Sequence, residues 1–87
     1  MANFSPTIMT DTARKVIETA VDYFGPATEV FLQRQSKFHL NNIEFKDLKR
    51  EHLPELAKWL RISGALIIDK ARANELSEKI NALYYLK

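Results

Sequence analysis

Apolar residues at helical spacing, followed directly by a Gly25-Pro26 step, constrain the fold of this chain more than any other feature. In the segment 13–24 the apolar residues are Ala13, Val16, Ile17, Ala20, Val21 and Phe24. This i, i+3, i+4, i+7 spacing places them on one face of an α-helix. Gly25 suits the left-handed conformation that closes a helix, and Pro26 suits the first position of the next helix. The pattern predicts a helix over 11–24, capped by Thr10 or Asp11, and then a corner.

A phosphate-binding loop is the functional alternative for the Gly25-Pro26 step. Nucleotide-binding loops need several glycines at fixed spacing after a strand, whereas this step has one glycine after a helix. The free amides of the following helix could still attract an anion. We expect a purely structural turn.

The second helix is expected over 26–39 and ends before Asn41-Asn42, because consecutive asparagines favour turns. Its predicted apolar face consists of Ala27, Val30, Phe31 and Phe38. Arg34 interrupts this face, and we expect its stem to lie along the edge of the core with the guanidinium in water.

An ordered connector over 40–49 leads to a third helix over about 50–67. Leu48 and Leu53 occupy the positions of a hydrophobic staple, and Pro54 fits the first turn. The predicted buried stripe consists of Leu53, Leu56, Ala57, Leu60, Gly64, Ile67 and Ile68. The pattern leaves open whether the helix runs through Ser63-Gly64 or breaks there; a continuous helix would need close packing against Gly64 to offset a cost of about 1 kcal/mol.

The last helix is expected over 70–85, capped by Asp69. One face of it carries Ala73, Leu76, Ile80, Leu83 and Tyr84. Together the patterns predict an all-α fold, a compact bundle of four helices over about 11–24, 26–39, 50–67 and 70–85. Residues 1–9 would be an N-terminal extension and 10–87 a single helical domain.

The composition narrows the class of protein. A chain of 87 residues can build only one core. It has no cysteine, which excludes disulfides, thiolate zinc sites and cysteine nucleophiles and fits a cytoplasmic protein. The N-terminus lacks the pattern of a secretory signal peptide. The longest apolar run near the end of the chain, residues 65–68, is far below the roughly 20 residues of a membrane span, so we expect a soluble protein.

Neither a metal site nor an active site is indicated by the polar residues. His39 and His52 are the only histidines, and they lack further ligands at one-turn spacing. Glu51 and Glu55 could share a face beside His52, but such charges are usually solvated. The serines lack a glycine elbow or a neighbouring histidine; they are Ser5, Ser36, Ser63 and Ser77. We therefore expect no catalytic residue, no cofactor and no metal.

Basic residues concentrate in the middle of the chain. Residues 33–62 carry seven basic and four acidic side chains, a net charge of +3. Those on or beside the third helix are Lys46, Lys49, Arg50, Lys58 and Arg61. A helix-turn-helix would place such a helix in the major groove of DNA. Against this alternative, Asp47, Glu51 and Glu55 alternate with the basic residues, and the preceding turn is too long for that motif.

Large aromatic residues on the border of the small core suggest a docking surface. Tryptophan, tyrosine and arginine dominate the binding energy of protein interfaces. The predicted surface consists of Trp59, Phe45 and Tyr84, with Arg34 and Arg61 at its edge. A domain this small also leaves apolar area that a partner or a second copy can cover. The first hypothesis is thus a non-enzymatic module that binds another protein or itself.

Several short motifs between residues 20 and 83 resemble those of small uncharacterised helical domains of bacteria. They are Gly25-Pro26-Ala27 before a helix with Arg34, then Leu48 with Leu53-Pro54-Glu55-Leu56-Ala57, then Ala73 and Leu76. Such domains occur at the ends of multidomain regulatory and signalling proteins and also as single-domain chains. The resemblance implies an interaction or regulatory role and transfers no catalytic residue.

Overall fold

A computed structural model describes residues 9–85, and this part of the chain is all-helical. The elements are α1 (Asp11–Phe24), a 3₁₀ turn (Gly25–Ala27), α2 (Thr28–His39), two further 3₁₀ turns (Phe45–Asp47 and Arg50–His52), α3 (Leu53–Gly64) and α4 (Lys70–Leu83). Residues 1–8 of the predicted N-terminal extension and residues 86–87 lie outside the described residues.

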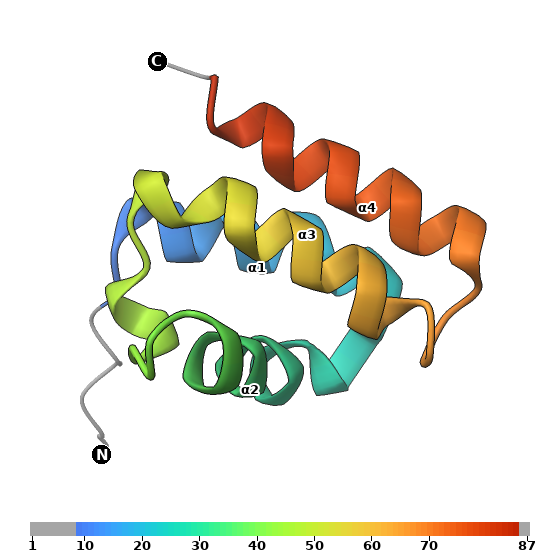
Figure 1. The fold of residues 1–87 in the computed structure, drawn as a ribbon, viewed down its shortest axis with the longest axis horizontal. Helices are drawn as coiled ribbons and strands as arrows, with labels where there is room; N and C mark the ends of the chain where they lie inside the picture. The colour runs from blue at the N-terminus through green and yellow to red at the C-terminus, as the bar shows by residue number, and fades with distance from the viewer. Residues whose placement is uncertain (1–8, 86–87) are drawn as a thin grey trace.

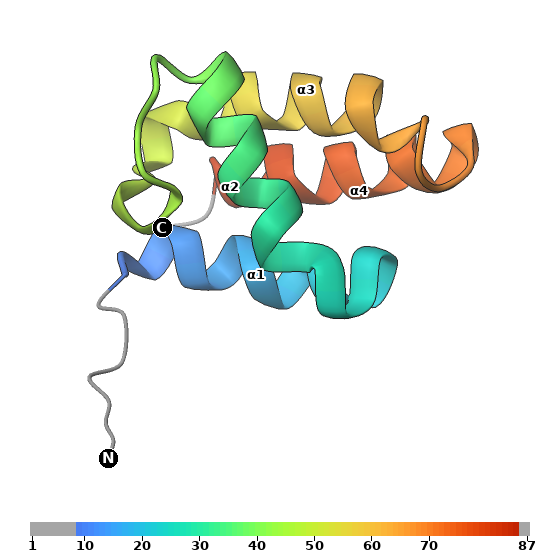
Figure 2. The same ribbon diagram turned by 90° about the horizontal axis from the view of Figure 1, so that it is seen from below.

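The helices do not form the predicted bundle of four. Three of them, α1, α3 and α4, run along the long axis of the molecule, and α2 crosses them steeply (Figures 1 and 2). α4 packs against both α3 and α1, while α2 packs against α1 and α3. The expected four-helix arrangement is therefore wrong, because the Gly25-Pro26 corner turns the chain across the other helices.

Local capping signals explain where the helices begin and end. The amide of Ala13 donates to Thr10 Oγ1 (3.1 Å) and the amide of Arg72 to Asp69 Oδ1 (2.7 Å), so both predicted caps form. Gly25 closes α1 with a φ of 58°, a value that disfavours side chains. Asn41 and Asn42 also have positive φ and mark the end of α2.

Four predicted boundaries need correction. Residues 25–27 form a 3₁₀ turn, so α2 starts two residues later than position 26. Residues 50–52 form a separate turn before α3, which ends at Gly64. The carbonyl of Gly64 accepts the amides of Ile67 (2.9 Å) and Ile68 (2.8 Å), which closes the turn before α4. α4 itself ends at Leu83, short of the predicted residue 85.

One apolar core lies between the helices. The predicted faces of α1, α3 and α4 supply most of it, and its fully buried members include Val16, Ala20, Leu56, Leu60, Leu76 and Ile80. The predicted stripe of the third helix is wrong beyond Gly64, because Ile67 lies in the exposed turn after α3. Phe24 and Phe31 pack across the corner with ring centroids 4.5 Å apart.

The buried face of α2 differs from the predicted one. The residues that it buries are Thr28, Phe31, Leu32, Gln35 and Ser36. Of the predicted face, Val30 and Phe38 point outward and Phe31 alone is buried. Successive residues of a helix are rotated by about 100°, which places Val30 almost opposite Thr28. Arg34 thus lies on the exposed face of α2 and does not border the core as predicted.

Candidate functional site

A groove of about 590 Å³ runs along the outward face of α2. One side of it is α2, and the other side is the connector after α2 together with Met9. The residues of α2 that line it are Glu29, Val30, Gln33, Arg34, Lys37 and Phe38, and those of the connector are Glu44, Phe45 and Lys46. We call this feature the α2 groove.

The α2 groove combines exposed apolar side chains with charges of both signs. Val30 is 60% exposed and Phe38 is 72% exposed. Arg34 lies between them, one turn from each. Within residues 9–85, neither Arg34, Lys37 nor Glu29 takes part in an ion pair. These groups are therefore available to a ligand or partner.

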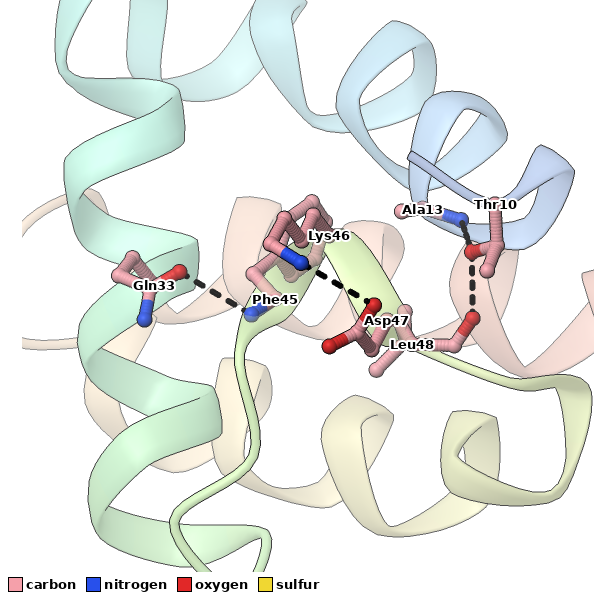
Figure 3. A network of polar contacts seen from close by, with 7 residues as sticks. All are labelled: Thr10, Ala13, Gln33, Phe45, Lys46, Asp47 and Leu48. Atoms are coloured by element: carbon pink, nitrogen blue, oxygen red, sulfur yellow. Dashed lines mark hydrogen bonds and ion pairs between the residues drawn. The ribbon is translucent and has the colours of Figure 1, made fainter. Parts of the chain in front are cut away.

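Hydrogen bonds fix the connector as the wall of the α2 groove (Figure 3). Gln33 Oε1 accepts the amide of Phe45 (3.0 Å), which ties the connector to α2. The amide of Thr10 donates to the carbonyl of Lys46 (3.0 Å). The Thr10 hydroxyl donates to the carbonyl of Leu48 while it caps α1. The wall is thus held by α1 and α2 together.

Of the predicted docking surface, the α2 groove contains Arg34 and Phe45. The Phe45 side chain is only 4% exposed, so it supports the wall from inside the core. Trp59 is half-buried and stacks on His39, with ring centroids 3.8 Å apart and planes at 8°. Trp59 Nε1 donates to Glu55 (2.9 Å). Trp59 therefore joins α3 to the end of α2 instead of standing free.

Tyr84 and Arg61 lie outside the lining of the groove. Tyr84 is half-buried after α4, where Arg50 lies over its ring at 5.3 Å and donates to its backbone carbonyl. Its ring also meets Tyr85 edge to face at 5.1 Å. Arg61 is exposed in the last turn of α3. The structure thus gives Trp59 and Tyr84 intramolecular partners, and the lining of the groove contains neither of them.

The basic residues of the nucleic-acid alternative have separate surroundings. Lys46 lines the groove and pairs with Asp47 (3.4 Å), Arg50 contacts Tyr84, and Lys58 lies 5.3 Å from the centroid of the Trp59 ring. Lys49 and Arg61 are exposed. They come from the connector, the turn before α3 and α3 itself.

His52 has a structural role that the sequence did not suggest. Its Nδ1 accepts the amide of Lys49 (2.9 Å) and so stabilises the turn that precedes α3. His39 is the stacking partner of Trp59. Each histidine thus contributes to the junction of neighbouring elements.

Sequence reasoning assigned the main apolar residues of the groove, Val30 and Phe38, to the core and gave Lys37 no role. The available signal was that α2 carries apolar side chains on more than one face, since Leu32 lies on the face opposite Val30. Such a helix has two candidate core faces. The spacing alone does not choose between them.

Residues 9–85 contain no group of three or more histidine and carboxylate side chains placed to hold a metal ion. In that same stretch, no helix has both the length and the apolar character needed to cross a membrane. Comparisons with protein-family models, with curated proteins and with solved structures find no match.

Proposed function

We propose that this chain is a non-enzymatic helical module that binds another protein or a second copy of itself through the α2 groove. The observation that carries the proposal is the exposure of Val30 and Phe38 on a helix that buries the polar Gln35 and Ser36 on its other face. Apolar side chains that stay exposed gain nothing from folding, and polar groups that are buried without a hydrogen-bond partner, such as Gln35 Oε1 and Ser36 Oγ among the described residues, lower stability. A helix with this arrangement is better explained by a contact made on its outward face.

The proposal shifts the docking surface away from the aromatic border predicted from the sequence. Arg34 remains in it, and Phe45 supports it from the core. Trp59 and Tyr84 are engaged with His39 and Arg50, so a partner would have to break these contacts to use them. The interaction or regulatory role implied by the resemblance to small uncharacterised helical domains of bacteria is compatible with such a module.

Partner capture from the native cell tests the proposal. Phe38→Asp places a charge in the apolar part of the groove, and we expect it to abolish recovery of the partner. Leu66→Asp is the matched control, because Leu66 is 87% exposed in the turn after α3 and does not line the groove. Circular dichroism checks that both variants are folded.

Two results would contradict the groove as the docking surface. One is partner recovery that survives Phe38→Asp but is lost with Leu66→Asp, which would move the contact to the turn between α3 and α4. The other is loss with Trp59→Ala alone, which would favour the border predicted from the sequence.

Nucleic-acid binding through Lys46, Lys49, Arg50, Lys58 and Arg61 is the competing function. It predicts a shift of DNA or RNA at low salt that weakens steeply as salt is added, because phosphate contacts release counterions. A steep salt dependence that is lost with Arg61→Glu would replace the proposed function. The contacts of Arg50 with Tyr84 and of Lys46 with Asp47 do not favour it.

A further inference from the structure

The outward face of α2 is complementary to itself. It carries an acidic residue, Glu29, and an apolar residue, Val30, near its beginning, and a basic residue, Lys37, and an apolar residue, Phe38, near its end. All four side chains are exposed and line the α2 groove. We propose that a second copy of this chain occupies the groove, with the two α2 helices antiparallel about a twofold axis. This inference rests on the proposed function and names its partner.

Helix geometry gives the register of the pair. In a twofold contact, residue i of one copy meets residue j of the other, and the reverse contact also forms. An axis midway between Gln33 and Arg34 brings Glu29 within one residue rise, about 1.5 Å along the helix, of Lys37 of the second copy. The same axis brings Val30 of one copy within one residue rise of Phe38 of the second copy.

The two kinds of contact lie on separate flanks of the pair. At about 100° per residue, Glu29 lies on the flank near the connector and Phe38 on the opposite flank. Lys37 and Val30 lie about 20° apart in the middle of the face, Lys37 on the side of Glu29 and Val30 on the side of Phe38. The twofold axis keeps each flank on its own side, so two ion pairs form along one edge and two apolar contacts along the other. In this register Val30 lies level with Lys37 of the second copy and Glu29 lies level with Phe38, so each ion pair and each apolar contact joins residues one position apart.

The symmetry has one unfavourable consequence. It brings the two Arg34 side chains close to the axis, where their like charges repel. The α2 helix has 12 residues, which is about 18 Å. We expect a contact confined to one helix of this length to bury less area than the roughly 800 Å² per partner of a standard interface. We therefore expect association in the range of about 10 µM to 1 mM, and we expect Arg34→Gln to tighten it.

Charge exchange between positions 29 and 37 tests the register. We expect Glu29→Lys or Lys37→Glu alone to weaken self-association of the full chain at least about tenfold, because each replaces two ion pairs with two repulsions. The double variant Glu29→Lys/Lys37→Glu restores both pairs and should dimerise like the original chain. An equimolar mixture of the two single variants should form a heterodimer. Sedimentation equilibrium measures all four.

Several outcomes would overturn the dimer. They are a monomer at about 1 mM, a dimer that neither single variant weakens, and single variants that are not rescued by the double variant. A chain that stays monomeric while Phe38→Asp still abolishes partner capture would refute the dimer and leave the proposed function standing. We also expect Phe38→Asp to weaken self-association, because it places a charge in the apolar contact. If Phe38→Asp changes neither partner capture nor self-association, both the dimer and the proposed function are refuted.

Discussion

α3 and α2 have the same length, but they differ in how their sequences match their surroundings. α3 buries the apolar residues that its spacing predicts, among them Leu53, Leu56 and Leu60. α2 buries the polar residues Gln35 and Ser36 and exposes Val30 and Phe38. Both helices have 12 residues, so length is not the cause.

The difference shows where this chain departs from optimal packing. The apolar face of α3 contributes to the free energy of folding, since each fully buried leucine contributes about 1.5–3 kcal/mol. Val30 and Phe38 of α2 contribute little to folding because they remain in water. Natural sequences tend to break local rules at functional sites, and α2 is the helix that breaks them here.

The largest expected effect is the difference in stability between truncating a side chain of α3 and truncating one of α2. Leu60→Ala removes a fully buried side chain of α3 and should lower the free energy of unfolding by about 2–5 kcal/mol. Phe38→Ala on α2 should change it by less than about 0.5 kcal/mol, although it removes more atoms. Urea unfolding of both variants measures the contrast. Equal losses would show that Phe38 is packed in solution and would remove the contrast between the helices.

A smaller effect is expected where the wall of the groove is tied to α1. Thr10→Ala removes both the cap of α1 and the hydrogen bond to Leu48, and should lower the free energy of unfolding by about 1–2 kcal/mol. Thr10→Ser keeps the hydroxyl and should retain most of the stability. Thermal unfolding compares them. A Thr10→Ser variant as unstable as Thr10→Ala would show that the methyl group, and not the hydrogen bonds, holds the wall.

Two serines, the buried Ser36 and the half-buried Ser77, should respond in opposite directions to replacement by alanine. Ser36 on α2 is fully buried, and its hydroxyl has no hydrogen-bond partner within residues 9–85. Ser36→Ala should therefore raise the free energy of unfolding by about 1 kcal/mol. Ser77 on α4 donates to the carbonyl of Ala57 (2.7 Å), so Ser77→Ala should lower it by a similar amount. Guanidinium unfolding measures the change in the free energy of unfolding for both variants. A lower free energy of unfolding for Ser36→Ala would show that the Ser36 hydroxyl has a hydrogen-bond partner.

The smallest effect concerns the exposed contact between α1 and α4. A hydrogen bond with Tyr23 raises the pKa of Lys79 above its ordinary value of 10.5, and the ammonium lies 5.2 Å from the centroid of the Tyr23 ring. The stabilisation is therefore complete below pH 10.5 and is lost as the pH rises through the raised pKa. Lys79→Gln should flatten this part of the stability profile. A profile unchanged by Lys79→Gln would show that the contact contributes nothing.

The candidate site was less predictable than the fold. The sequence placed Arg34 in a docking surface, and the groove contains it. It also predicted an exposed border of Trp59, Phe45 and Tyr84, but each of these side chains meets an intramolecular partner or the core. Large aromatic residues favour burial as strongly as binding, and the sequence does not show which partner is within reach.

By itself, the sequence determined the start of α1 at Asp11, the corner at Gly25, the turn at Asn41-Asn42 and the buried face of α3, while it left the cap of α1 open between Thr10 and Asp11. These features depend on residues within one or two turns of the chain, so local geometry is enough to specify them. The tertiary structure alone decided that α2 crosses the other helices and which of its faces is buried. α2 has apolar residues on both faces, and the choice between them was made by the surfaces of α1 and α3 on which it packs.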